Sequence, residues 1–209
     1  NLLTNGDCQE ENPGIQLIDA CGICGGGITD EEDCPDFALS FDGVDDYVEY
    51  GGNNLPIGNS DRTISCWVQP HVVGQYALFG YGNQDENTAF EIFFYDDNGT
   101  LRPAIHYAYG NSGYENGLEV NLNEWSHLVA TYDGISSRIY VNGEISITDI
   151  QPLNTEKIFR HIGALNHGPS TDQYLDGMIN GCAIWNNTLT DNEINSLYNN
   201  GNHIDLSSN

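Results

Sequence analysis

Basic residues are almost missing from this sequence. Its 209 residues include only four arginines and one lysine against 31 acidic residues, so the formal net charge is −26. Such a surface repels phosphate groups and anionic lipid headgroups, which excludes nucleic acid and membranes as expected partners. Calcium, which prefers oxygen ligands, suits this surface better.

Long hydrophobic runs are missing as well. No stretch of 18 or more apolar residues occurs, and no basic segment followed by an apolar one marks a signal peptide. The apolar fraction of 39%, with 11% aromatic residues, still suffices for one buried core. Because the chain begins at Asn1 rather than at Met, we expect it to be part of a larger secreted or surface protein.

The cysteines divide the chain into two parts. Four of the six lie near the N-terminus, at Cys8, Cys21, Cys24 and Cys34. Their even number and clustering favour disulfides in an extracellular protein, whereas a zinc site needs two short-spaced pairs and only Cys21 and Cys24 form one. Three pairings of the four remain open. Residues 19–26 (DACGICGG) resemble the cysteine-rich spacers of thrombospondin-related extracellular proteins, so residues 1–35 are expected to be a spacer and residues 36–209 the main domain.

The main domain has the pattern of an all-β sandwich. Short β-rich runs alternate with Gly, Asn and Asp, at about 37–41, 45–50, 62–70, 76–82, 88–96, 101–109, 125–132, 136–142, 144–149, 158–165 and 174–186. Asn98-Gly99 and Asn142-Gly143 predict tight hairpin turns. One helix is expected after Thr190, which forms a capping box with Glu193, and Gly201 is expected to end this helix. The helix is expected to pack against the edge of the sandwich.

The order of several motifs resembles laminin G-like jelly rolls. The motifs are residues 38–48 (ALSFDGVDDYV), 63–68 (TISCWV), 125–134 (WSHLVATYDG), 138–144 (RIYVNGE), 162–163, 176–181 (DGMING) and 189–197. The resemblance covers about residues 36–200. It implies a concanavalin A-like jelly roll of two antiparallel sheets, a superfamily that also holds pentraxins, legume-type lectins and glycan-cleaving enzymes. Function is therefore left open by the fold. The three tryptophans, Trp67, Trp125 and Trp185, lie in signature strands and are expected in the core.

The same resemblance implies a structural calcium ion. Its candidate ligands are Asp42, the Gly43 carbonyl and Asn180, although the family's usual Asp-Glu pair is Asn180-Gly181 here, which weakens the site. The alternative for Asp42 is a turn-stabilising side chain. Residues 83–87 (NQDEN) resemble a pentraxin calcium segment, which makes Asp85 a second candidate.

The remaining two cysteines also find a counterpart in this resemblance. Cys66 stands where pentraxins have a strand cysteine, but their partner position is Val129 here, so Cys182 is the available partner. If their strands are neighbours, the two can form a disulfide. The alternative is a pair of buried thiols.

A catalytic site is not expected. Glycan-cleaving enzymes on this fold place acids at Glu-x-Asp-x-x-Glu, whereas residues 91–96 read EIFFYD. Phe93 replaces the middle acid, and Glu91 and Asp96 point to opposite faces of a strand. A lyase is disfavoured too, because Tyr107 does not share a face with Arg102 and His106.

Alternation instead predicts a binding face. Phe90, Ile92 and Phe94 should face the core, and Glu91, Phe93 and Tyr95 the outside. On the next strand Arg102 and His106 share that outer face, and Tyr81 and Tyr114 are expected to extend it from loops. An open face of aromatic and polar groups suits sugar rings. The alternative is an ordinary solvated face with one Glu91–Arg102 ion pair.

Three functions follow from these observations, in decreasing order of support. The first is an extracellular, non-catalytic module that binds carbohydrate or mediates adhesion to an extracellular protein. The second is a structural module that associates with itself or with neighbouring domains. The third is a polysaccharide hydrolase or lyase with an unfamiliar site.

Overall fold

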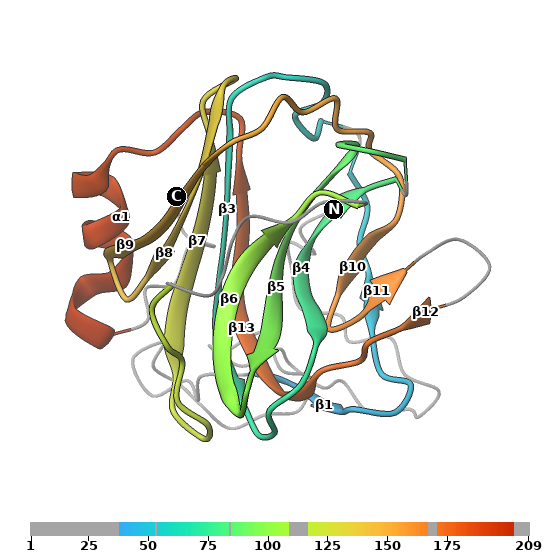
Figure 1. The fold of residues 1–209 in the computed structure, drawn as a ribbon, viewed down its shortest axis with the longest axis vertical. Coiled ribbons are helices and arrows are strands. Elements are labelled where there is room, and N and C mark those ends of the chain that lie inside the picture. Colours follow the sequence, from blue (N-terminus) through green and yellow to red (C-terminus); the bar gives the residue numbers. More distant parts are fainter. Residues whose placement is uncertain (1–37, 53, 84, 109–116, 167–170, 203–209) are drawn as a thin grey trace, which may run out of the picture. The chain divides into compact units, whose positions relative to one another are not determined.

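Two antiparallel sheets make up the main domain in the computed structural model, which describes residues 38–202 except 53, 84, 109–116 and 167–170. The six-stranded sheet has the order β1 (Leu39–Asp42), β13 (Asp176–Trp185), β3 (Arg62–Pro70), β7 (Ser126–Tyr132), β8 (Ser136–Val141) and β9 (Glu144–Ile150). The five-stranded sheet has the order β2 (Val48–Glu49), β10 (Arg160–Ile162), β4 (Tyr76–Gly82), β5 (Ala89–Asp97) and β6 (Thr100–His106). The sheets face each other as two layers (Figure 1), which confirms the predicted sandwich.

Strand boundaries differ from the prediction mainly in the second half of the chain. The run predicted at 158–165 divides into β10 and a separate short strand, β11 (Leu165–Asn166), which pairs with β12 (Thr171–Asp172). Gly163 separates β10 from β11 with a φ of 86°, a left-handed conformation that breaks the strand. The predicted cysteine-rich spacer, residues 1–35, lies outside the described residues.

The core lies between the sheets and is made by alternating side chains. Phe90, Ile92 and Phe94 of β5 are fully buried in it, as predicted, together with Leu101 and Ile105 of β6. Asn98 and Gly99, with φ values of 53° and 92°, make the tight turn that joins β5 to β6. Asn142 and Gly143 do the same between β8 and β9.

The helix α1 (Asp191–Tyr198) begins as predicted and ends earlier. The Thr190 side chain accepts from the Glu193 N–H, and the Glu193 carboxylate accepts from the Thr190 N–H, so the capping box is confirmed. Asn199 ends the helix in the left-handed conformation (φ 45°), and a 3-10 turn, Asn199–Gly201, follows. Gly201 is therefore not the residue that ends it. Among the described residues, no helix is long and apolar enough to cross a membrane.

The helix packs on the outer face of the six-stranded sheet (Figure 1) and not on its edge. Ile194 is fully buried with Val129 and Tyr140 in a second apolar cluster. Trp67 is also buried there, with its ring 5.9 Å from that of Tyr198. The expectation for Trp125 is wrong, because 38% of this residue is exposed.

Candidate functional site

The outer face of β5 and β6 carries most of the predicted ligand-binding residues. The register places Glu91 opposite His106 and Tyr95 opposite Arg102. Nδ1 of His106 lies 3.0 Å from Oε2 of Glu91. Glu91 therefore pairs with His106, and the expected Glu91–Arg102 ion pair is wrong because the two residues lie four positions apart in the ladder.

This face is buried and not open. The exposed fractions are 8% for Glu91, 2% for Phe93, 9% for Tyr95 and 8% for His106. Leu165 of β11 packs on this face in a cluster with Phe93 and Tyr95. Sequence reasoning expected solvent here because alternation distinguishes the two faces of a strand but does not show which segments cover them.

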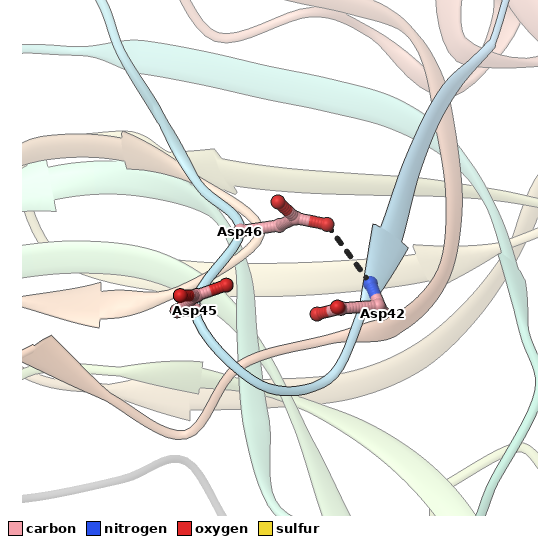
Figure 2. A group of neighbouring side chains, drawn as sticks. All are labelled: Asp42, Asp45 and Asp46. Carbon is pink, nitrogen blue, oxygen red and sulfur yellow. Dashed lines mark hydrogen bonds between the residues drawn. The ribbon is translucent and has the colours of Figure 1, made fainter.

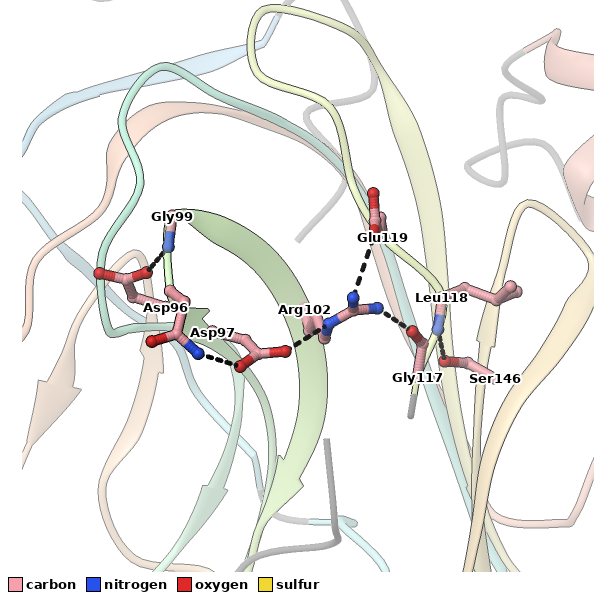
Figure 3. A network of polar contacts seen from close by, with 9 residues as sticks. Asp96, Asp97, Gly99, Arg102, Gly117, Leu118, Glu119 and Ser146 are labelled. Atoms are coloured by element: carbon pink, nitrogen blue, oxygen red, sulfur yellow. Dashed lines mark hydrogen bonds and ion pairs between the residues drawn. The ribbon is translucent and has the colours of Figure 1, made fainter. Parts of the chain in front are cut away.

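Arg102 uses its guanidinium to bind another part of the chain. Nε lies 2.9 Å from Oδ2 of Asp97, and Nη2 lies 2.9 Å from Oε1 of Glu119 (Figure 3). Nη1 donates to the Gly117 carbonyl, and the Val120 N–H donates to the Leu101 carbonyl. Arg102 thus fastens residues 117–120 to β6, so its contacts support the fold.

Of the two tyrosines expected to extend this face, Tyr81 is the one that lies in the described residues, and it does not extend the face. Tyr81 lies in β4 and is completely buried in the core. Its hydroxyl donates to the Pro56 carbonyl at 2.7 Å, and burial raises its pKa. The prediction for Tyr81 is therefore wrong. Tyr114 lies outside the described residues.

A row of titratable residues crosses the five-stranded sheet on the same face. Pairing across β2, β10, β4, β5 and β6 aligns Glu49, His161, Gly80, Glu91 and His106. Burial lowers the pKa of His161, while Glu49 and Glu91 act in the opposite direction. Gly80 is required because any Cβ would collide with the Glu91 backbone. Sequence reasoning missed Glu49 and His161, since no local pattern shows which distant strands pair.

Within the described residues of β5, the carboxylate spacing expected of a glycosidase is missing around Glu91. Asp97, the next carboxylate of β5 on this face, lies six residues further, about 20 Å away at 3.3 Å per residue. Paired glycosidase carboxylates lie roughly 5 to 9.5 Å apart. Asp96 is exposed, and its carboxylate accepts the Gly99 N–H at 2.7 Å, so it stabilises the hairpin turn.

The predicted calcium ligands separate into two places. Asp42 lies opposite Asp176 in the β1–β13 ladder, so Asn180 is four residues away, about 13 Å along the strand. The Asn180 side chain accepts the Gly181 N–H at 2.7 Å. Calcium ligands lie within 2.3–2.6 Å of their ion, so Asn180 and Asp42 cannot share one. The combined site is therefore wrong.

Asp42 has two other acidic neighbours. Ligand oxygens of Asp42, Asp45 and Asp46 lie within 4.8 Å of one another, and all three residues are exposed (Figure 2). The Asp42 N–H donates to Asp46 at 3.2 Å, and the Val44 N–H donates to Asp42 at 2.9 Å. The second bond is the turn-stabilising role considered for Asp42. The oxygen donors are of the kind that calcium prefers.

The other candidate positions take part in local turns. Gly43 has a φ of 77°, which favours glycine, and a Cβ there would lie 3.0 Å from that of Asp176. Asp85 is exposed, and its backbone carbonyl accepts the Thr88 N–H at 3.1 Å. These contacts give both residues a role in a turn that does not involve a metal ion. A cation bound at Asp85 stays a prediction.

Cys66 and Cys182 lie on neighbouring strands. The β3–β13 register shifts between Asn180, opposite Trp67, and Ala183, opposite Ser65, which leaves Cys182 beside Cys66. Both pack in the main core, and both are thiols in this structure. Burial raises the pKa of both thiols, and that of Cys182 rises to about 12. The N-terminal Cys8, Cys21, Cys24 and Cys34 lie outside the described residues.

A groove lies away from this sheet face, where the loop after β2 meets the end of β13. Its volume is about 490 Å³. The described residues that line it are Gly51, Gly52, Asn54, Leu55, Pro56, Ile184, Trp185 and Asn186. Sequence reasoning missed this groove because its two walls are more than 100 residues apart in the chain.

Three solved structures have similar folds, each at 17% sequence identity. A heptameric SAP-like pentraxin from Limulus polyphemus has a TM-score of 0.55, over 73% of this chain and 80% of that one. Domain 4 of a GH43 extracellular arabinanase from Geobacillus stearothermophilus, in complex with arabinotriose, has a TM-score of 0.52, over 77% and 71%. A putative carbohydrate binding protein from Bacteroides ovatus has a TM-score of 0.57, over 76% and 45%.

Sequence comparison leads to the same fold. No curated protein matches this chain significantly. The laminin G family model of the concanavalin A-like lectin/glucanase superfamily matches residues 42–195, most of the chain. The two-sheet architecture is the one that this match requires. The chain therefore belongs to the laminin G-like family of the concanavalin A-like lectin/glucanase superfamily.

Proposed function

We propose that this domain is a non-catalytic carbohydrate-binding module of a larger extracellular protein. Two structures with this fold support the ligand class: an arabinanase domain in complex with arabinotriose and a putative carbohydrate binding protein. The acidic surface, with its formal net charge of −26, opposes binding to nucleic acid and anionic membranes. The proposed location is extracellular, in keeping with the six cysteines.

The arrangement around Glu91 carries the non-catalytic part of the proposal. His106 pairs with Glu91, Phe93 replaces the middle acid of the hydrolase motif, and Asp97 is about 20 Å away. A hydrolase of this fold needs two carboxylates on the same face within about 10 Å. The described residues of β5 therefore form a strand of a glycan-binding fold without the pair of carboxylates that cleavage requires.

Calcium is a separate part of the proposal. Among the described residues, Asp42 belongs to a group of three acidic residues whose ligand oxygens lie within 4.8 Å of one another, so we place the ion at Asp42, Asp45 and Asp46. A calcium ion would reduce the repulsion among these three charges and stiffen the loop between β1 and β2. It would act on stability and does not need to contact the glycan.

The experiment is a glycan array, followed by affinity electrophoresis with and without a chelator. Binding without release of reducing or unsaturated ends supports the proposal. Absence of any glycan ligand, in calcium and in chelator alike, contradicts the binding function. Release of reducing or unsaturated ends from a bound polysaccharide contradicts the non-catalytic assignment alone.

One observation favours the second function, self-association. The strand β9 is an edge of the six-stranded sheet, and it exposes 54% of Ile145 and 73% of Ile150. Exposed apolar side chains on an edge strand favour pairing with another chain, whereas charges such as Glu144 and Asp149 of β9 oppose it. Sedimentation of the wild type and of Ile145→Lys tests this. A concentration-dependent dimer that the substitution abolishes would favour self-association.

A further inference from the structure

The groove between the loop after β2 and the end of β13 has an uncharged lining. None of the described lining residues is ionisable, although the chain has 31 acidic residues. The lining includes two asparagines, Asn54 and Asn186, and one tryptophan, Trp185. A lining of this composition provides no charged side chain for a phosphate, a sulfate or a cation, whereas hydroxyl groups pair with amides and sugar C–H faces pack on indole rings.

We propose that this groove, and not the face of β5 and β6, binds the glycan, and that the glycan is uncharged. The inference rests on the proposed carbohydrate-binding function and gives it a location and a ligand class. The volume of about 490 Å³ is within the usual range for small-ligand sites. The face of β5 and β6, by contrast, buries its aromatic side chains, Phe93 and Tyr95, to more than nine tenths.

One wall of the groove is fixed from behind by hydrogen bonds. The Pro56 carbonyl accepts from the Tyr81 hydroxyl at 2.7 Å and from Nη1 of Arg62 at 3.4 Å. At the other end of the loop, the Tyr50 carbonyl accepts from Nε of Arg160 at 2.8 Å. A loop fastened at both ends loses little conformational freedom when a ligand binds, which favours affinity.

The opposite wall belongs to the six-stranded sheet. Ile184 and Trp185 pair with Ile64 and Thr63 of β3. Trp185 also packs on the cluster that includes Leu189, so its backbone and part of its ring are held in place. The remainder of Trp185 is accessible, because the residue is only partly buried. A rigid, partly exposed tryptophan is the kind of surface on which a sugar ring stacks.

Asn186 adds a practical condition. It begins an Asn-Asn-Thr sequence, which is an N-glycosylation acceptor pattern. An N-linked glycan on Asn186 would stand at the rim of the groove and compete with a ligand. The binding experiment therefore uses the full chain without N-linked glycans, produced in a bacterial periplasm so that disulfides can form.

Two substitutions test the groove. Trp185→Ala removes the aromatic surface, and Gly51→Gln adds a side chain at a lining position where a Cβ meets nothing within 4 Å. Each is expected to weaken binding of neutral glycans from the array by about tenfold or more, measured by calorimetry. Trp125→Ala is the matched control, because it also removes an exposed tryptophan, but one outside the groove. Thermal unfolding of each variant verifies that it is folded.

The outcomes separate the location from the function. Loss of affinity in Gly51→Gln, with Trp125→Ala unchanged, supports the groove even if Trp185→Ala proves too unstable to assay. Wild-type affinity in a folded Gly51→Gln and a folded Trp185→Ala overturns the groove and leaves the carbohydrate-binding function intact. Ligands that are all acidic overturn the uncharged class, and a wild type without any glycan ligand overturns the function and the groove together.

Discussion

Arg62 is a completely buried cation, and we expect its replacement by methionine to destabilise the domain strongly. No carboxylate forms a salt bridge with it in the described residues. Its guanidinium lies 5.7 Å from the Phe90 ring and 5.4 Å from the Tyr132 ring. Nη2 also donates to the carbonyls of Gly58 and Ser60 at 2.7 Å, and burial lowers the pKa of the group.

The size of the effect follows from what each partner loses. The Pro56 carbonyl keeps the Tyr81 hydroxyl and the Gly58 carbonyl keeps the Thr155 N–H, but the Ser60 carbonyl loses the donor that it has in this structure. One unsatisfied carbonyl costs about 1–3 kcal/mol, and the two desolvated cation–π contacts contribute about 2 kcal/mol. We therefore expect Arg62→Met to lower the free energy of unfolding by about 3–5 kcal/mol.

Urea unfolding followed by tryptophan fluorescence measures this loss, and the melting temperature should fall by roughly 10 °C. Arg138→Met is the matched control. Arg138 pairs with Asp133 at 2.9 Å, but both side chains are about one-third exposed, so its loss should cost less than about 1 kcal/mol. Burying a guanidinium also costs desolvation free energy, which methionine does not pay. An Arg62→Met variant as stable as the wild type would show that this cost cancels the contacts of Arg62 and would refute the reasoning.

Three further predictions concern the cysteines, the calcium ion and the helix cap. In oxidised protein, peptide mapping should find Cys66 linked to Cys182. Because this disulfide closes a loop of roughly 100 residues, Cys182→Ser should lower the free energy of unfolding by an amount on the order of 4 kcal/mol. Alkylation of both thiols in protein purified without reductant would contradict this prediction. Calcium should raise the melting temperature of the wild type but not that of Asp45→Asn. This substitution removes one ligand charge and leaves intact the two backbone hydrogen bonds that Asp42 and Asp46 accept. Equal shifts of the melting temperature in both proteins would place the ion elsewhere. The hydrogen bond from the Thr190 backbone N–H lowers the pKa of the Glu193 carboxyl below its ordinary value of 4.5 in the folded protein. The cap should therefore stabilise the helix above pH 4.5, and this stabilisation should disappear as the pH falls through the lowered pKa of the folded state. NMR shifts of residues 191–198 should titrate there in the wild type, and a Glu193→Gln variant that titrates identically would exclude the cap as their cause.

The sequence by itself determined the elements that depend on neighbouring residues. Alternation of Phe90, Ile92 and Phe94 identifies the core face of a strand because the side-chain period of a strand is two. Asn98-Gly99 identifies a tight turn because both positions need a positive φ. The Thr190–Glu193 spacing identifies a helix start because the two residues satisfy each other's backbone N–H groups.

Only the tertiary structure decided which distant residues meet. The pairing of Glu91 with His106 depends on the β5–β6 register, and Leu165 of β11 packs against Phe93 and Tyr95 on the same sheet face. The groove depends on packing of the loop after β2 beside Trp185. Such contacts join segments tens to more than a hundred residues apart, and a local pattern carries no information about them. The physical reason is that register and packing are selected by the energy of the whole core, to which every strand contributes.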